Sequence, residues 1–351
     1  MVERGDRMRM TFAGEKAKEA LGGLVTNDVI ALREGTGHRA AALTPKGRVI
    51  ALCRVFDRGA DLLVDCDAAA GEGFTAMIRK FVNPRLARYV VVTEATDCLG
   101  VHGGDAARVL ARALSGGAGD DGVAGATRAP GAASITEADV GRLDALGAFD
   151  GFLAGDDESK CYVIRSVDLS APGFEVFGAR ARVAQVRAAL IAAGTRLASP
   201  EEVKALRVEA GLPEWGAEMD IETIPQEAVL DDLGAISFSK GCYTGQEVVA
   251  RIHFRGHVNR QLRLLTSAAP LAVGARVIDA AGSDVGDVRT SVVSATRGAL
   301  AIAMVRREVP LGSEVSVRSG STETPAMLAP LVTTGVAPSV ATGATSAATT
   351  A

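Results

Sequence analysis

The feature that most constrains the fold is a change of hydrophobic period near residue 258. From there to about residue 320, apolar residues recur at every second position in short runs separated by glycine-containing turns: QLRLLTS, ARVIDA, DVRTSVVS, ALAIAMV and EVSVRS. Such alternation is typical of half-buried β-strands, and several short strands in succession favour a small antiparallel barrel or sandwich. We therefore predict a separate C-terminal β-barrel domain.

Upstream of this region, strand and helix periods alternate. HRAAALTPKGRVIALCRVF predicts two strands joined by a turn at 45–47, DLLVDC extends that sheet, and apolar residues at helical spacing predict a helix up to residue 81. A second helix has a strong start signal, because Ser199 is a good N-cap and Glu202 can complete a capping box. Gly211 is expected to end that helix. Short strands mixed with helices predict an α+β region.

The predicted organisation of the 351 residues follows from these periods. We expect residues 1–255 to form two α+β lobes, roughly 1–125 and 126–255, and residues 256–325 to form the barrel. The Gly/Ala-rich stretch 115–134 is aperiodic and is predicted to be a loop. The Ala/Thr-rich residues 326–351 carry no charge and are predicted to be a disordered tail.

Composition excludes several classes of protein. The chain has 42 acidic and 38 basic residues, a net charge of -4, which argues against dedicated nucleic-acid binding or a membrane-surface role. It has no signal-peptide pattern and no long uncharged apolar run, so we expect no membrane association and a cytoplasmic location. Its five cysteines form no CxxC pair, which argues against a disulfide framework or a Cys-rich zinc site.

Three weaker patterns have ordinary explanations beside functional ones. Gly117, Gly119 and Gly122 match GxGxxG but lack a following amphipathic helix, so a flexible loop is the better interpretation. His253 and His257 are four apart, but no matching further ligand is present, and we predict no metal site. Residues 248–278 contain five arginines and no acidic residue, which indicates either a local anion site or simply Arg-rich composition: Arg251, Arg255, Arg260, Arg263 and Arg276.

The sharpest local signal is KGCYTGQEVVAR, residues 240–251. Gly241 and Gly245 permit tight or left-handed backbone on both sides of Cys242, which predicts a turn at the thiol. A capping box from Thr244 to Glu247 would start a helix, so the helix dipole and the neighbouring lysine would favour the thiolate. The thiol could then be nucleophilic, redox-active or a soft metal ligand. The alternative is a small buried side chain with glycines that serve only the turn.

This segment resembles the signature of the YgfZ family around its characteristic cysteine, over ISFSKGCYTGQEVVARIHFRG at 236–256. The resemblance extends through LRVEAGLPEWGAEMDIETIPQEA at 206–228 and to GLVTNDVIAL and ALTPKGRVI near the N-terminus, and covers roughly 12–325. The family comprises folate-binding paralogues of the glycine-cleavage aminomethyltransferase (T-protein). The resemblance implies a three-lobed GcvT-like fold around a central channel, with tetrahydrofolate or a folate derivative in the channel.

The resemblance also implies partners and site residues. The family is implicated in folate-dependent assembly or repair of iron–sulfur proteins, so folate and iron–sulfur enzymes or their assembly factors are the expected partners. Cys242 and Lys240 are the expected chemically active residues. The expected folate-binding residues are Asn27, Glu209, Gly241, Tyr243, Gly245, Gln246, Glu247, Arg251 and Arg255.

Two departures from the aminomethyltransferases bear on the activity. Their catalytic aspartate is matched here by Ala51 or Leu52, which cannot orient or deprotonate a folate nitrogen. Their pterin-binding glutamate aligns with Ala171, and the loss of a bidentate acceptor weakens pterin binding. A classical aminomethyltransferase is therefore not expected.

We expect a folate-binding accessory protein for iron–sulfur proteins that acts through Cys242. One alternative is a folate-dependent one-carbon transferase or demethylase that uses Glu209, Glu247 or Asp28 in place of the aspartate. Another is a folate-independent thiol-redox or iron-handling module. These three hypotheses stay open at the level of sequence.

Overall fold

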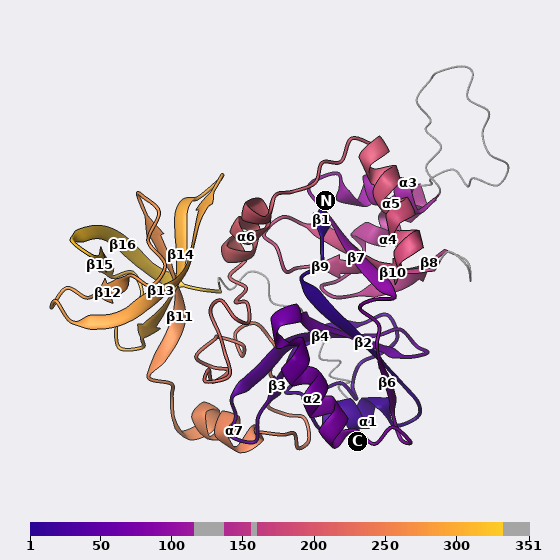
Figure 1. The fold of residues 1–351 in the computed structure, drawn as a ribbon, viewed down its shortest axis with the longest axis horizontal. Helices are drawn as coiled ribbons and strands as arrows, with labels where there is room; N and C mark the ends of the chain where they lie inside the picture. Colours follow the sequence, from indigo (N-terminus) through magenta and orange to yellow (C-terminus); the bar gives the residue numbers. More distant parts are fainter. Residues whose placement is uncertain (116–136, 156–159, 333–351) are drawn as a thin grey trace, which may run out of the picture.

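The computed structural model describes residues 1–115, 137–155 and 160–332, and its chain folds into three lobes (Figure 1). Two lobes are five-stranded antiparallel sheets with helices, and the third is a closed six-stranded barrel. The predicted α+β class and the C-terminal antiparallel barrel are therefore confirmed. Helix α6 (Pro200–Glu209) packs against the barrel strands, and helix α7 (Gln246–Arg255) lies at the bottom of Figure 1 beside the first lobe.

The sheet of the first lobe has the strand order β3-β4-β5-β2-β6. Its elements are β2 (Arg7–Ala13), α1 (Ala17–Gly22), β3 (Gly37–Leu43), β4 (Val49–Asp57), β5 (Leu62–Asp67), the short 3-10 helix η1 (Ala68–Ala70), α2 (Gly71–Phe81) and β6 (Arg88–Val91). The predicted turn at 45–47 joins β3 to β4. The predicted helix ending at residue 81 is α2.

The two faces of this first sheet differ in chemistry because side chains alternate along each strand. Cys53 and Val55 of β4 pack with Phe74 of α2 in an apolar core on the helix-covered face. Arg54 and Phe56 point to the opposite face, where they meet residues of the second lobe. The first lobe therefore presents a partly charged face to its neighbour.

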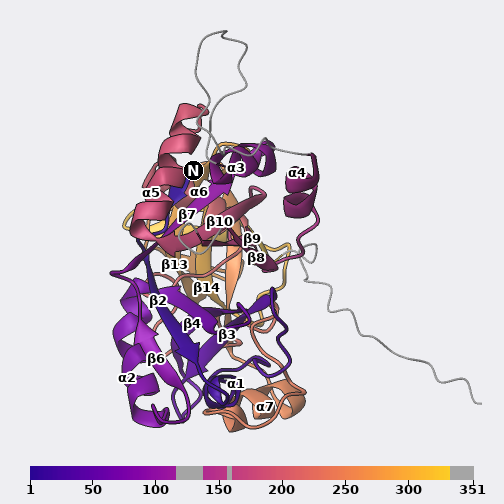
Figure 2. The same ribbon diagram turned by 90° about the vertical axis from the view of Figure 1, so that its right-hand side faces the viewer.

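The second sheet has the order β1-β7-β10-β9-β8. Its elements are β1 (Val2–Glu3), β7 (Thr96–His102), α3 (Ala106–Leu114), α4 (Glu137–Asp144), β8 (Gly151–Ala154), β9 (Cys161–Ser166), β10 (Gly173–Ala179) and α5 (Arg180–Ala192). The sheets do not divide at residue 125 as the sequence predicts. β1 and β7 belong to the second sheet, because β7 pairs with β10 over its whole length. Figure 2 shows the first two lobes stacked on one another.

The barrel closes through β16, in the order β11-β14-β13-β12-β15-β16. Its strands are β11 (Arg260–Ser267), β12 (Arg276–Ile278), β13 (Asp284–Ser294), β14 (Gly298–Arg306), β15 (Glu314–Ser319) and β16 (Thr322–Pro330). The predicted disordered tail is therefore wrong for residues 326–330, whose apolar positions pair with β11. The rest of that tail from 333, and the predicted loop from 116 onward, lie outside the described residues.

The capping prediction for α6 is confirmed. The Ser199 side chain accepts a hydrogen bond from the Glu202 backbone, and the Glu202 carboxylate accepts one from the Ser199 backbone. Gly211 follows the helix with a positive φ of 69°. This well-defined start fixes the direction in which α6 delivers Arg207 and Glu209 to the junction of the lobes.

Candidate functional site

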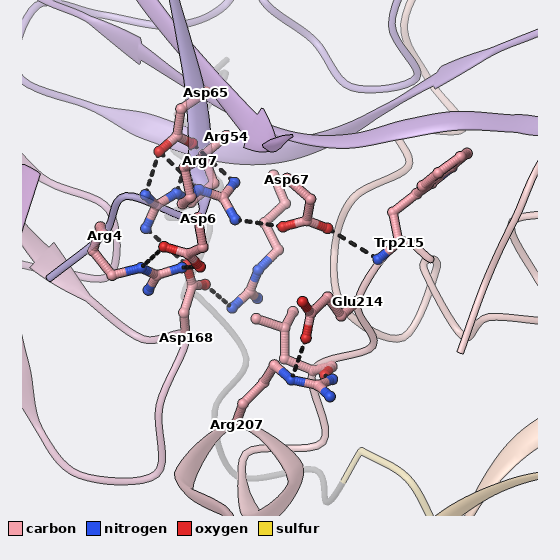
Figure 3. A network of polar contacts seen from close by, with 12 residues as sticks. Arg4, Asp6, Arg7, Arg54, Asp65, Asp67, Asp168, Arg207, Glu214 and Trp215 are labelled. Carbon is pink, nitrogen blue, oxygen red and sulfur yellow. Dashed lines mark hydrogen bonds and ion pairs between the residues drawn. The ribbon is translucent and has the colours of Figure 1, made fainter. Parts of the chain in front are cut away.

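An ion-pair network fills part of the interface between the first two lobes (Figure 3). At its centre is Arg54 of β4, whose side chain is 2% exposed. Its guanidinium pairs with Asp65 of β5 in the same sheet. It also pairs across the interface with Asp168, at 2.7 Å, and with Glu175 of β10, at 2.8 Å. One arginine therefore binds carboxylates from both sheets.

Further arginines complete the network. Arg7 contacts Asp65 at 2.9 Å, and Arg4 contacts Glu175 at 3.2 Å. Burial by itself would raise the pKa of Asp65, but Arg54 and Arg7 hold that pKa well below its usual range. The carboxylates stay ionised and paired, so this part of the interface serves structure.

The network continues into a less enclosed cluster around Asp67 and Glu214 (Figure 3). Asp67 contacts Arg7 at 2.9 Å and accepts a hydrogen bond of 3.0 Å from the backbone of Trp215. Arg207 of α6 contacts Glu214 at 3.1 Å through its Nε atom. The Glu214 side chain is 44% exposed. We call Asp67, Glu214, Arg207 and Trp215 the junction cluster.

Protonation is easier in the junction cluster than in the network. Burial raises the pKa of Asp67, and burial also raises the pKa of Glu214. The indole Nε1 of Trp215 is buried and has no hydrogen-bond partner among the described residues. The cluster therefore combines two carboxylates that protonate more easily than usual, whereas the Trp215 ring points away from them and packs against the apolar cores (Figure 3).

Cys242 differs from the other cysteines in exposure. All five cysteines are described and free, and Cys53, Cys66, Cys98 and Cys161 are buried whereas Cys242 is exposed. The interpretation of Cys242 as a small buried side chain is therefore wrong. Burial raises the pKa of Cys53 and Cys98 well above the usual value, which keeps these two thiols protonated.

Lys240 anchors the Cys242 loop to the first lobe. Its ammonium group donates to the backbone carbonyls of Gly22, Val25 at 2.7 Å and Asn27 at 3.1 Å. It also lies 5.0 Å from the centre of the Tyr243 ring. Burial lowers the pKa of Lys240 to about 8. The donors of this lysine are thus directed at the backbone between α1 and β3.

Asn27 makes the reciprocal connection. Its side-chain amide donates to the carbonyls of Arg39, at 2.7 Å, and Gly234, at 2.9 Å. The neighbouring backbone joins the same two segments, because the Ser237 N–H donates to the Thr26 carbonyl. Asn27 and Lys240 are brought together, because the Lys240 ammonium binds the Asn27 carbonyl. Their observed contacts position the loop.

Gly245 allows the closest approach between the loop and the first lobe. Its φ is 82°, and a Cβ added there would lie 2.5 Å from the carbonyl oxygen of Thr44. Gly241 is different, because its φ is not positive and a Cβ added there would have no neighbouring atom within 4 Å. The expected left-handed freedom is therefore needed at Gly245 and not at Gly241.

The predicted capping box at the start of α7 is wrong. Gly245 is the N-cap residue and offers no side chain, so no side-chain cap bond forms. Gln246 stabilises the turn instead, because its side-chain oxygen accepts from the backbone of Tyr243 at 3.1 Å. Burial raises the pKa of Tyr243 to about 12, so this phenol stays protonated. Glu247 is exposed in the first turn of α7.

Arg251 and Arg255 line a separate groove of about 380 Å³ on the far end of α7. The groove is shared with Glu227 and His257, and Cys242 is not part of it. Arg260 is already paired with Glu227 at 3.0 Å. The structure therefore does not bring the arginines and the thiol into one pocket.

Glu209 and Leu52 occupy positions near the lobe junctions. Glu209, at the end of α6, accepts hydrogen bonds from Ser170 of the second lobe, at 2.5 Å, and from Thr296 of the barrel, at 3.4 Å. Of the two residues matched to the family's aspartate, Ala51 packs in the helix-covered core of the first lobe. Leu52 packs with residues of α6 and the barrel, so the apolar replacement on the interior side is Leu52.

Sequence reasoning missed both the network and the junction cluster. A signal was present: Arg7 and Arg9 alternate with Met8 and Met10 in β2, so the same strand has a charged and an apolar face. Charges at every second position of an otherwise buried strand indicate a polar interface. Partners such as Asp168 lie too far along the chain to be paired by spacing alone.

The described residues contain neither a metal-binding cluster nor a membrane-spanning helix. No group of three or more His, Cys, Asp or Glu side chains among them could hold a metal ion. No helix in the described ranges is long and apolar enough to cross a membrane.

Comparisons with known proteins give partial sequence matches and a match of the whole fold. No protein-family model matches the chain. The chain is 55% identical over 65 residues to a tRNA-modifying protein YgfZ of Escherichia coli, and 51% identical over 71 residues to the protein of that name from Hamiltonella defensa. These matches cover 18% and 20% of this chain, and the matched segments span about a fifth of the relatives' length.

The fold has a close structural counterpart. The crystal structure of glycine cleavage system aminomethyltransferase T from Bartonella henselae superposes with a TM-score of 0.76. The superposition covers 94% of this chain and 85% of the other, at 18% sequence identity. At that identity the likeness shows a shared fold and confirms the predicted GcvT-like architecture.

Proposed function

We propose that this chain, which resembles YgfZ proteins over part of its length and has a GcvT-like fold, binds tetrahydrofolate or a folate derivative and supports assembly or repair of iron–sulfur proteins through the Cys242 loop. One observation carries the proposal: Cys242 is exposed on a loop whose backbone is fixed, whereas the other four cysteines are buried. An exposed thiol on an anchored loop can meet a partner's metal or thiol without losing its position.

The junction cluster supplies side chains that suit a folate. A pterin needs an apolar or aromatic surface and a carboxylate that accepts from its amino and ring N–H groups. Glu214 offers a half-exposed carboxylate bound to one Arg207 nitrogen, and it lies next to Trp215, whose half-buried indole packs against the apolar cores. We assign to Glu214 the acceptor role that Ala171 cannot fill. Glu209 borders the same junction, and Arg251 and Arg255 would meet the anionic tail only if it crosses to the α7 groove.

Binding is tested by calorimetric titration of the reduced protein with tetrahydrofolate and its polyglutamate at two salt concentrations. We expect micromolar affinity, weakened about tenfold in Glu214→Gln, because a neutral amide accepts less well from the pterin edge. Glu222→Gln is the matched control, since Glu222 is exposed and has no side-chain ion pair among the described residues. Absence of binding up to millimolar ligand would refute the folate part of the proposal.

The role of the thiol is tested in a strain that lacks the protein. Cys242→Ala should fail to restore the activity of iron–sulfur enzymes, whereas Cys161→Ala, a change of a buried cysteine, should restore it. Full rescue by Cys242→Ala would show that the thiol is dispensable. Rescue by a variant that has lost folate binding would favour the folate-independent thiol or iron-handling module.

A folate-dependent one-carbon transferase or demethylase is the second candidate. The raised pKa values of Asp67 and Glu214 favour it, because burial makes these carboxyl groups easier to protonate. These two carboxylates are better placed for that role than Glu247, which is exposed on α7, or Asp28, which accepts a backbone hydrogen bond from Ala31. A tetrahydrofolate-dependent conversion of a methylamine donor that Asp67→Asn abolishes would support it.

The curated relatives are named for tRNA modification. We propose that any such effect of this chain is indirect, through support of an iron–sulfur enzyme that acts on tRNA, because the acidic composition argues against dedicated RNA binding. We also propose a cytoplasmic location, where the reduced state of Cys242 would be maintained.

A further inference from the structure

The outer strand of the first sheet, β6, has an open edge. It pairs with β2 alone, and no described strand lies on its other side. The backbone of Val92 donates to Arg9 in the ladder, and hydrogen-bonded residues alternate in an antiparallel pair. The backbone groups of Tyr89 and Val91 therefore face away from β2. An open edge of this kind can pair with another extended chain.

Exposed apolar side chains lie on β6 and on the segment that leads into it. Phe81 ends α2, and Leu86 lies in the loop that leads to β6; they are 49% and 52% exposed. Val90 and Val91, on opposite faces of β6, are each 48% exposed. Because an added strand alternates its side chains, it would contact one valine on each face.

The same segment is strongly cationic. Residues 73–93 contain four basic residues and neither Asp nor Glu, in a chain with a net charge of -4: Arg79, Lys80, Arg85 and Arg88. All four are exposed, and none forms an ion pair with a described residue. Lys80 lies 5.1 Å from the centre of the Phe81 ring. Other surface arginines have carboxylate partners, such as Arg196 with Glu202 and Arg318 with Glu323.

We propose that residues 79–91 form a docking edge for an acidic, extended segment of a partner protein, which adds a strand to β6. The open backbone groups supply strand pairing, the apolar side chains supply contact area, and the four cations select carboxylates. A nucleic acid would satisfy the charge but would not use the open N–H and C=O groups of the edge. The proposal is independent of folate binding and of Cys242.

The test is fluorescence anisotropy of a labelled peptide, EVEVEVEVE, titrated with the full chain. We expect micromolar binding that weakens with added salt, and about tenfold weaker binding of EPEPEPEPE, which keeps the charge but cannot form a regular strand. The double substitution Arg85→Glu with Arg88→Glu should weaken binding about tenfold or more. Arg108→Glu with Arg112→Glu, on exposed positions of α3, changes the net charge equally and should leave the affinity within about twofold.

Val91→Pro tests the edge itself, since it removes an outward N–H group and leaves the ladder with β2 intact. We expect about tenfold weaker peptide binding with an unchanged circular dichroism spectrum. Should the variant misfold, the two peptides still decide the question with the unaltered protein. Equal affinity for both peptides, or a tighter complex with single-stranded oligouridine that Arg85→Glu with Arg88→Glu abolishes, would overturn the proposal.

Discussion

Arginine has opposite roles in two regions of this molecule. Between the first two lobes, Arg54 is buried and surrounded by carboxylates from both sheets. On α7, next to the Cys242 loop, Arg251 and Arg255 are exposed and form no ion pair with a described residue. A buried charge is tolerated only when it is paired, whereas an exposed one costs little unpaired. The comparison separates the part that holds the lobes together from the part available to other molecules.

The largest effect on stability should come from removing the buried arginine between the first two lobes. Arg54→Leu leaves Asp65, Asp168 and Glu175 without their shared partner, and should lower the free energy of unfolding by about 3–5 kcal/mol. Urea denaturation measures this loss. The matched change Arg255→Leu should cost less than about 0.5 kcal/mol. Similar losses in both variants would remove the distinction between the two regions.

Lowering the pH should also weaken the buried ion pairs and so reduce the stability of the protein. Burial alone would raise the pKa of Asp65 and Asp168, but Arg54 keeps both folded pKa values below the unfolded value of about 4. Their contribution is therefore complete above the unfolded pKa and is lost as pH falls through the folded pKa values. The contribution of this pair to the melting temperature should be constant near neutral pH and fall below about pH 4. In Arg54→Leu the buried carboxylates should take up protons more readily, which makes this fall shallower; parallel curves would contradict the account.

Two glycines of the anchored loop, Gly245 and Gly241, should differ in how well they tolerate alanine. Gly245→Ala would place a Cβ 2.5 Å from the Thr44 oxygen at a φ of 82°, and should cost about 2 kcal/mol or more. Gly241→Ala meets no neighbouring atom and should cost less than about 0.5 kcal/mol. Urea denaturation gives both values. Hydrogen exchange over residues 236–246 should rise only in the first variant, and an equal rise in both would argue against docking at Gly245.

The smallest effect on stability should come from replacing the exposed thiol of Cys242. Cys242→Ala should change the free energy of unfolding by less than about 0.5 kcal/mol, because the side chain is exposed. In native protein, Ellman's reagent should titrate one thiol rapidly and the remaining four only on unfolding. In Arg54→Leu, the four buried thiols should react faster, and the reaction rate of the exposed thiol should not change. Rapid reaction of several thiols in the native protein would contradict the assigned burial.

The elements that the sequence predicted well are those defined by local chemistry. Ser199 and Glu202 lie within one helical turn, so their capping box is visible as spacing. The alternating runs of the barrel are equally local. At α7 the local signal was misleading: Thr244 and Glu247 have capping-box spacing, but Gly245 takes the N-cap position because the loop must approach Thr44 closely.

The parts that could not be predicted depend on distant pairings. Whether Ala51 or Leu52 faces the interior is set by the pleat of β4 and the irregular register beside it. The contacts of Lys240 involve carbonyls more than 200 residues earlier in the chain. Family resemblance predicted that Lys240 and Asn27 are site residues, and the structure shows that the side chain of each binds backbone carbonyls.

The separation of Arg54 from Asp168 along the chain also bears on synthesis. Their pairing spans 114 residues, so a ribosome completes the first sheet well before its partner carboxylates emerge. During that interval the charged side chains on its inner face, among them Arg54 and Asp65, face water, and they disfavour association with other nascent chains. The arginine that later joins the lobes thus acts first as a gatekeeper against aggregation.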